Sequence, residues 1–450
     1  RKSWTQGKIS QGVFLDVSAA FDKCWHAGLL AKLAQVKVED SCHDLFRSYL
    51  ANRKQFVVVE GCKSDLRDVQ AGVPQGSRLG PLLWILYIND ITENLESEVM
   101  LFADDTCLFS TGLDPTETTS IINRDLQKIS DWSVKWKVTF NPGKTKDVIF
   151  SQKYLFNSLP IVFNHVFVDR VTEHRHLGVW LSSSLDFKKQ VKEVCQKANF
   201  KLSILRSVKY LKRQTLDLLY KLTVRSVIDY GLITYYHSLN QTEIIRLNQI
   251  QYSAAKLCTG SLHFSNQSKL EADLGWETLE TRAKFLGLCQ FQKFHLKLTR
   301  PLILSIMPSF NTNRKTRNTE IYQNFPKKSH KFSNSFFPYF TKLFNTLSID
   351  IQSENDMISF KEKLKLEIKP KKHKHFSWGS KRGNALQTQL RVGRSFLNAD
   401  SFSIHLADSD LCLCSRSETT THYLTQCFLY TEERRLLFNS IEQLIHKGNG

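Results

Sequence analysis

Two adjacent acidic residues, Asp104 and Asp105, are the strongest candidates for chemistry in this sequence. They interrupt an apolar stretch from Val99 to Phe109, a pattern that predicts two β-strands joined by a tight turn. Asp is also a common turn residue, so the pair alone does not identify a site. Two carboxylates on a rigid turn can bind Mg²⁺, which takes carboxylate oxygens together with substrate phosphates. A metal site here requires a third acid from elsewhere in the chain.

Asp16 is the candidate for that third acid. It lies in the short apolar run Val13–Val17, which is typical of a buried strand, and a buried acid needs a partner. The same residue could cap the helix predicted by the apolar spacing from Leu29 to Leu33, and the local sequence leaves both roles open. Either role predicts a strand, a turn and a helix in succession.

A glycine- and proline-rich loop occupies residues 71–82 and contains Pro74, Gln75 and Gly76. It leads into an apolar helix through Trp84 and Ile91. Glycine lets a backbone approach a flat ligand closely, so this loop is a candidate for ligand binding, although most such loops only connect elements.

The following elements predict an α+β domain. Asp114-Pro115 begins a helix with one apolar face, residues 141–144 form a turn, and residues 147–150 and 177–181 form short strands. Acid-bearing strands with helices packed on one face are typical of that fold class.

From about residue 186 the pattern becomes helical, with apolar stripes that include Val191, Leu202 and Leu216. Lys and Arg occupy the opposite faces. A solvated face is the simplest explanation, but the excess of one sign favours contact with a phosphate backbone. The basic run at residues 369–375 is expected to be an exposed linker.

Four potential soft ligands lie close together near the end of the chain: Cys412, Cys414, His422 and Cys427. This set suits tetrahedral zinc, although its spacing is not that of common zinc fingers and isolated Cys and His residues often serve only in packing. Both interpretations remain open from the sequence.

Composition sets the limits for these hypotheses. The 450 residues carry a formal net charge of +19, which indicates a polyanionic partner such as nucleic acid or an anionic membrane surface. The longest apolar stretch, Leu82–Ile88, is too short to span a bilayer. The ten scattered cysteines predict reduced thiols in the cytosol or nucleus. Because the sequence begins with Arg1 rather than Met, we interpret it as a fragment of a longer protein.

Three motifs in order carry a resemblance to a known family. The strings FLDVSAAFDKCWH, AGVPQGSRLGPLLWILYINDI and MLFADDTCLF resemble the palm motifs of reverse transcriptases from non-LTR (LINE-type) retrotransposons. Residues 141–145 and 176–179 extend the resemblance, and the Cys/His cluster does so more loosely. The resemblance implies a right-hand polymerase palm, an antiparallel sheet with helices on one face, followed by an α-helical thumb and a basic C-terminal region.

The resemblance also assigns roles to individual residues. Asp16 and Asp104 would be the principal ligands of two Mg²⁺ or Mn²⁺ ions, and Asp105 a supporting one. Phe21 would lie beneath the incoming sugar and select deoxynucleotides. The loop residues Pro74, Gln75 and Gly76 would lie near the templating base and the nucleotide, and Lys144 would be a general acid for pyrophosphate.

The implied activity is RNA-templated addition of dNMP to a DNA primer, with an RNA template, a DNA target and dNTPs as partners and no membrane. The predicted domains are residues 1–181 (palm with partial fingers), 182–300 (thumb and connection), 301–385 (basic linker) and 386–450 (Cys/His knuckle, a candidate Zn²⁺ site). The family implies a nuclear location, with cytoplasmic transit as a ribonucleoprotein. Fingers motifs before Asp16 are missing, so an inactive or domesticated remnant that binds nucleic acid is one alternative. A group II intron-type maturase is another.

Overall fold

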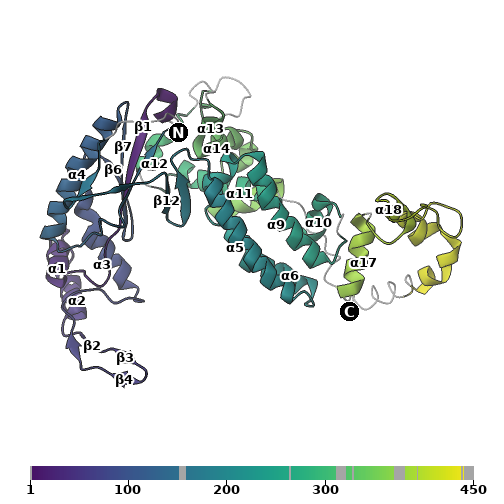
Figure 1. The fold of residues 1–450 in the computed structure, drawn as a ribbon, viewed down its shortest axis with the longest axis horizontal. Coiled ribbons are helices and arrows are strands. Elements are labelled where there is room, and N and C mark those ends of the chain that lie inside the picture. Colours follow the sequence, from purple (N-terminus) through teal and green to yellow (C-terminus); the bar gives the residue numbers. More distant parts are fainter. Residues whose placement is uncertain are drawn as a thin grey trace. The chain divides into compact units, whose positions relative to one another are not determined.

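The computed structural model describes residues 3–151, 159–262, 265–299, 301–310, 321–326, 329–368, 381–392, 394–436 and 439. The chain divides into two compact units, unit 1 (residues 1–187) and unit 2 (residues 188–450), coloured from purple to teal and from teal to yellow in Figure 1. The predicted division into four domains is finer and stays a prediction. The predicted linker at residues 369–375 lies outside the described residues.

Unit 1 is built on a five-stranded sheet. Its spatial order is β11 (Asp169–Arg170), β8 (Lys146–Phe150), β1 (Ile9–Leu15), β7 (Asp105–Gly112) and β6 (Glu98–Phe102). All neighbours are antiparallel except β11 and β8, which are parallel. The central strand β1 is buried along almost its whole length, because both faces of the sheet are covered.

Helices cover one face of this sheet and a hairpin covers part of the other. Val13 and Leu15 of β1 belong to the main core, into which the helices α1 (His26–Gln35), α3 (Leu79–Ile88) and α4 (Pro115–Lys135) also send side chains. Phe14 points to the opposite face and belongs to a smaller core with Leu181. The predicted α+β class is therefore confirmed.

That hairpin corrects one sequence prediction. Its strands are β12 (Glu173–His176) and β13 (Val179–Ser182), and Leu177 and Gly178 form the turn between them with φ values of 45° and 79°. The expected strand over residues 177–181 therefore starts two residues before the observed one, because a positive φ at Leu177 is rare for a branched side chain and the sequence gives no sign of it.

The beginning of α4 matches the sequence prediction. Asp114 is the N-cap, and its carboxylate accepts a hydrogen bond from the backbone N–H of Thr116 at 3.0 Å. Pro115 occupies the first turn, where its missing N–H costs nothing. By contrast, Asp16 does not cap α1, whose N-cap is Trp25, so that alternative for Asp16 is excluded.

The remaining elements of unit 1 are short. They are η1 (Ser3–Gln6), α2 (Asp40–Leu50), β2 (Lys54–Gln55), β3 (Val58–Val59), β4 (Cys62–Lys63), β5 (Arg67–Asp68), η2 (Asn89–Thr92), β9 (Val162–Phe163) and β10 (Val166–Phe167). Strands β2 to β5 form a ribbon that projects from the helices in Figure 1.

Unit 2 is helical in its described part. Its elements are α5 (Lys188–Ser207), α6 (Arg213–Leu219), the π-helix η3 (Tyr220–Arg225), α7 (Ser226–Asp229), α8 (Leu232–Tyr235), η4 (Tyr236–Ser238), α9 (Gln241–Thr259), α10 (Gln267–Leu274), α11 (Leu279–His295), α12 (Pro301–Ile306), α13 (His330–Ser333), α14 (Phe336–Asn345), α15 (Ile349–Gln352), α16 (Met357–Ile368), α17 (Lys381–Val392), α18 (Asn398–Phe402), η6 (His422–Gln426) and η7 (Phe428–Tyr430). No helix among the described residues is long and apolar enough to cross a membrane.

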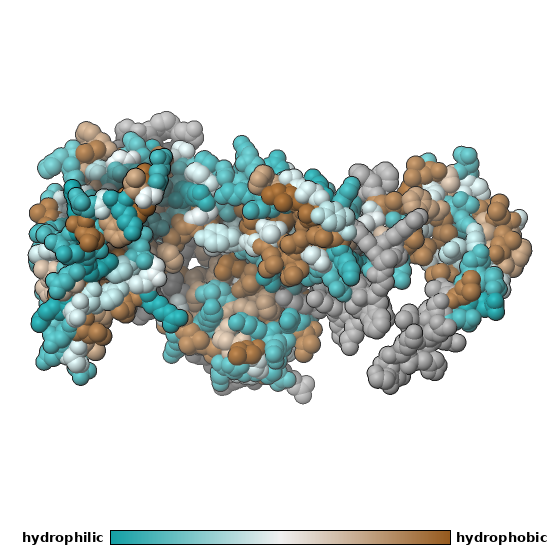
Figure 2. Space-filling view, turned by 90° about the horizontal axis from the view of Figure 1, so that it is seen from below, coloured by the Kyte–Doolittle hydropathy of each residue, from teal (hydrophilic) through white to brown (hydrophobic). Residues whose placement is uncertain are grey.

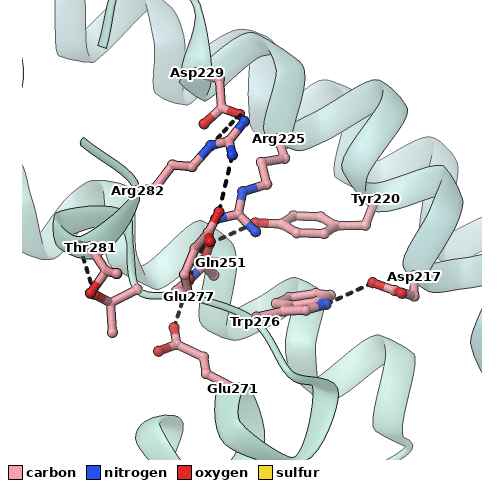
Figure 3. Close-up of polar contacts among 11 residues, drawn as sticks. Asp217, Tyr220, Arg225, Asp229, Gln251, Glu271, Trp276, Glu277, Thr281 and Arg282 are labelled. Atoms are coloured by element: carbon pink, nitrogen blue, oxygen red, sulfur yellow. Dashed lines mark hydrogen bonds and ion pairs between the residues drawn. The ribbon is translucent and has the colours of Figure 1, made fainter. Parts of the chain in front are cut away.

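A buried polar network joins the helices of unit 2 (Figure 3). Arg282 bonds Asp229 at 2.9 Å and Glu277 at 3.2 Å, and Glu277 also pairs with Arg225 at 3.2 Å. Breaking one member of such a network leaves a buried charge unpaired, so these contacts fix how the helices pack.

Candidate active site

Asp104 and Asp105 lie at the hairpin that joins β6 to β7, as the sequence predicts. Phe102 pairs with Asp105, which leaves Ala103 and Asp104 as the two turn residues. Ala103 has a φ of 54°, and its carbonyl accepts a hydrogen bond from the indole N–H of Trp84 at 3.0 Å. The buried Trp84 therefore anchors the turn, which gives the two carboxylates a rigid support.

Strand register brings Asp16 opposite this hairpin. Leu15 of β1 pairs with Thr106 of β7, so Asp16 and Asp105 are the next facing positions of the two antiparallel strands. The backbone of Asp16 is itself fixed, because its carbonyl accepts a hydrogen bond from the Asn141 N–H at 2.8 Å. Two acids from distant parts of the sequence thus meet at one edge of the sheet.

The electrostatics of the three acids are those of crowded like charges. Partial burial, and then the neighbouring carboxylates of Asp104 and Asp16, raise the pKa of the Asp105 carboxyl above its ordinary value. The side chain of His176 acts in the opposite direction. A bound cation would offset this repulsion.

The donor chemistry of the three acids fits a hard divalent cation. One carboxylate oxygen of Asp16 is shielded from solvent and accepts no hydrogen bond, and its nearest cation is the Lys144 ammonium at 3.5 Å. Lys144 is 69% exposed and is therefore only loosely held. The carboxylate set Asp16, Asp104 and Asp105 can hold Mg²⁺ or Mn²⁺ through oxygen atoms alone.

The loop that contains Pro74, Gln75 and Gly76 is tied to the segment that follows Asp16. The N–H of Val73 donates to the Phe21 carbonyl at 2.7 Å, and the amide of Gln75 donates to the Asp22 carboxylate at 2.8 Å. Gln75 and Gly76 are exposed, and Pro74 is half-buried. The loop and the first acid motif therefore form one continuous structure.

Phe21 is half-buried and packs at the edge of the core. Its ring lies 6.0 Å from that of Trp84, the residue that anchors the Asp104 turn. This single aromatic contact links the predicted sugar-selecting residue to the acidic turn. The role of Asp22 in holding Gln75 was not predicted, although its position in the same short motif as Phe21 could have suggested it.

His176 is a further neighbour of the site to which sequence reasoning assigned no role. Its Nε2 atom lies 3.8 Å from the Cys107 thiol, two residues beyond Asp105. Burial lowers the pKa of His176, while Asp105 acts to raise it. No local pattern could have found this pairing, because it depends on how the β12–β13 hairpin folds back over the sheet.

The four C-terminal candidate ligands come together in unit 2. The ligand atoms of Cys412, Cys414, His422 and Cys427 all lie within 4.8 Å of one another, and within the described part of the chain this is the one group of three or more potential ligands that is so close. The Cys412 and Cys427 sulfurs are 3.6 Å apart. Two sulfurs bound tetrahedrally to one zinc at about 2.3 Å lie at about that separation.

Local hydrogen bonds favour the thiolate form at Cys414, whereas the pKa of the Cys412 thiol is raised. Burial acts to raise the pKa of Cys414, but the Arg416 amide and the Cys427 and Cys412 thiols outweigh it, so the pKa is lowered overall. The thiolate is the form that binds metals. In Figure 2 this segment, at the right, displays hydrophobic residues. Leu413, between Cys412 and Cys414, is 93% exposed.

Residues 2–200 match the protein family described as "Reverse transcriptase (RNA-dependent DNA polymerase)". The match contains all three acids, the Pro74–Gly76 loop and Lys144. This stretch is a reverse transcriptase domain. Within it, Asp16 and Asp105 occupy facing positions of the antiparallel strands β1 and β7. The first and third sequence motifs meet at this point.

The relatives of this reverse transcriptase domain are polymerases of mobile elements. The chain is 28% identical over 273 residues to the RNA-directed DNA polymerase from mobile element jockey of Drosophila funebris, a match that covers 58% of this chain and 30% of the relative. It is 31% identical over 281 residues to the probable RNA-directed DNA polymerase from transposon X-element of Drosophila melanogaster. That match covers 59% of this chain and 30% of the relative. These homologues are non-LTR retrotransposon polymerases, which confirms the resemblance seen in the motifs. The chain therefore spans about 30% of their length.

A solved structure of apo telomerase from Candida Tropicalis also aligns with the chain. The TM-score is 0.32 and the identity 14%, over 56% of this chain and 46% of the telomerase. At that score the likeness carries no argument.

Proposed function

We propose that this chain catalyses RNA-directed DNA synthesis, the transfer of a dNMP from a dNTP to the 3′-hydroxyl of a DNA primer on an RNA template. The observation that carries the proposal is the facing of Asp16 and Asp105 across β1 and β7, with Asp104 in the adjoining turn, inside a reverse transcriptase domain. The chain spans about 30% of the length of its relatives, so we also propose that these 450 residues are active by themselves.

The three acids have the proposed role of metal ligands. Asp16 and Asp104 would hold two Mg²⁺ or Mn²⁺ ions, with Asp105 supporting them; such ions activate the attacking hydroxyl and stabilise the leaving pyrophosphate. Lys144, whose ammonium lies beside Asp16, can donate a proton to the pyrophosphate as it leaves. A flat ring at Phe21 would exclude a 2′-hydroxyl, and the exposed Gln75 and Gly76 would contact the nucleotide and template base.

The proposed partners follow from the net charge of +19 and from the basic surface of unit 2. On α5, Lys192, Lys197 and Lys201 are exposed and can contact phosphates of the template and primer. A chromosomal DNA primer would place the protein in the nucleus, after transit through the cytoplasm with its RNA template.

The first test is primer extension by the Asp104→Asn variant with Mg²⁺ on an RNA template. We expect a loss of roughly a hundredfold or more, because an amide cannot supply the negative charge that the cation requires. The matched control is Asp114→Asn, which changes the charge equally but keeps a good helix N-cap on α4.

Two outcomes would contradict the proposal. Near-normal extension by Asp104→Asn removes the metal assignment. A wild-type chain that binds the primer and template but extends nothing supports the alternative of a nucleic-acid-binding remnant.

We propose zinc as the ion of the C-terminal cluster. Purified protein should contain one zinc per chain, and Cys414→Ser should lose it, whereas Cys62→Ser, which alters an exposed free thiol in unit 1, should keep it. Elemental analysis measures both variants. Zinc-free protein whose Cys412, Cys414 and Cys427 thiols all react freely would instead support a packing role.

A further inference from the structure

Residues 54–68 form a single hairpin, here called the ribbon, that contains β2 to β5. Val58 pairs with Lys63, Val59 pairs with Cys62, and Lys54 pairs with Asp68. The turn consists of Glu60 and Gly61, both with positive φ, as in the tight turns that favour hairpins. The ribbon projects away from α1 and α2 in Figure 1.

The ribbon exposes several large apolar side chains. All of its residues are exposed, and five of them are large apolar residues that are 47–64% exposed: Phe56, Val57, Val58, Val59 and Leu66. Because neighbouring strand residues point to opposite faces, the run Val57–Val59 presents apolar side chains on both. A two-stranded hairpin is only marginally stable alone in water, so a partner that covers it would stabilise it.

The charge of the ribbon indicates what kind of partner this is. Its three basic residues are balanced by three acidic ones, whereas the whole chain carries +19. The ribbon therefore has no excess positive charge to attract a phosphate backbone. The partner that fits its exposed apolar side chains is an apolar polypeptide.

The outer edge of the ribbon is free to pair with another strand. Strands β2 and β3 each have one neighbour, β5 and β4 respectively, so their other edge has no strand partner among the described residues. The Val57 N–H donates a hydrogen bond to the Ser64 hydroxyl, and the Val57 carbonyl accepts one from the Ser64 backbone N–H, each at 2.9 Å. By the alternation of a strand, the backbone groups of Phe56 and Val58 point to the free edge.

The sequence of that edge is complementary to itself. If the segment from Gln55 to Val59 pairs antiparallel with an identical segment about Val57, the apolar Phe56 faces Val58, and the cation of Lys54 lies next to the anion of Glu60 at the start of the other copy's turn. Each opposite-charge or apolar cross-strand pair is favourable, and the arrangement is closed by a two-fold axis.

We propose that the ribbon is a homodimer interface, in which residues 55–59 of two copies pair antiparallel across a two-fold axis at Val57. This proposal is independent of the catalytic function. Pairing would remove the exposed edge, which otherwise is open to unspecific association.

The test is sedimentation of the nuclease-treated full chain over a wide range of concentration. We expect a species of twice 52.1 kDa that grows with protein concentration and with salt, since salt screens the repulsion between two basic chains. Val57→Lys should abolish it, because two lysines then meet at the axis. The control Val134→Lys, at a 77% exposed position on α4, should leave it intact.

Charge reversal tests the register. Lys54→Glu and Glu60→Lys should each weaken the dimer, and the two together should restore it. In both Lys54→Glu and the double variant, the new Glu at position 54 repels Asp68 of the same ribbon to the same extent. A stronger dimer in the double variant therefore reports only the pairing between copies. Circular dichroism confirms folding. A monomeric wild type, a dimer that survives Val57→Lys, or a double variant no more dimeric than its singles would each overturn the proposal.

Discussion

At the residue scale, two glycines of the candidate nucleotide loop differ in what surrounds them. Both have positive φ, 94° at Gly72 and 79° at Gly76, but a Cβ on Gly72 would lie 2.8 Å from the Asp22 carbonyl oxygen, whereas one on Gly76 would meet nothing within 4 Å. Gly72 is thus required by the protein's own backbone. Gly76 leaves space beside the site that a ligand can fill.

We therefore predict different defects for the two alanine substitutions. Gly72→Ala should lower the free energy of unfolding by about 1–3 kcal/mol and displace Val73 and Gln75, because the Asp22 backbone cannot move easily. Gly76→Ala should cost only about 1 kcal/mol, from its φ alone, but should raise the KM for dNTP. Chemical denaturation and steady-state primer extension separate the two effects.

The reverse pattern would show that the loop is misassigned. If Gly76→Ala leaves the KM unchanged while Gly72→Ala destabilises as expected, the loop is a structural connection and does not approach the nucleotide.

Residue-scale reasoning from the sequence located the candidate site but not its geometry. Asp104 and Asp105 were placed at a turn because the apolar runs around them are local. The facing of Asp16 and Asp105 depends on a strand register set over about ninety residues, which no local pattern encodes, and here the family resemblance supplied what periodicity could not. The pairing of His176 with Cys107 is likewise non-local.

At the element scale, the packing of α14 against η4 depends on a neutral histidine. His237 stacks on Tyr339 with ring centroids 3.9 Å apart, and burial lowers its pKa to about 4. Lys284 lowers this pKa further, and Glu280 acts to raise it. His237 Nε2 is buried without a hydrogen-bond partner, so protonation has no local acceptor to stabilise it.

This makes the packing sensitive to acid. Between about pH 6.5 and 4 the unfolded chain binds a proton that the folded chain does not, so stability falls as pH falls through that window, by up to roughly 3 kcal/mol from this group. His237→Phe keeps the stacking and removes the titration, so its loss of stability over the same window should be smaller by that amount. Urea denaturation at a series of pH values measures it, and equal losses in both proteins would refute this role for His237.

Elements with strong local signals were predicted well and those fixed by tertiary contacts were not. The cap at Asp114 and the apolar stripe of α5 are encoded within a few residues. The helical stripe that includes Leu216 instead leads into a π-helix, Tyr220–Arg225, where Tyr220 stacks on Trp276 with ring centroids 4.2 Å apart. That distortion accompanies buried contacts with α9 and the segment before α11, which no helical pattern reveals.

At the scale of the whole molecule, the net charge of +19 has to be assigned to particular surfaces. The ribbon is neutral, and α16 carries exposed lysines interspersed with Glu362 and Glu367. The exposed face of α5 is more one-sided, with Lys197 and Lys201 one helical turn apart. We therefore expect the phosphate contacts to be concentrated on α5.

Salt dependence tests this assignment. Binding of an RNA–DNA primer-template releases counterions, and each lost phosphate contact reduces the slope of log K against log salt concentration by about 0.9. Lys197→Gln with Lys201→Gln should reduce the slope by about 2. The matched pair Lys361→Gln with Lys365→Gln removes the same charge at the same spacing from α16 and should change it little. If both pairs alter the slope equally, binding reports the total charge of the chain, and α5 has no special role.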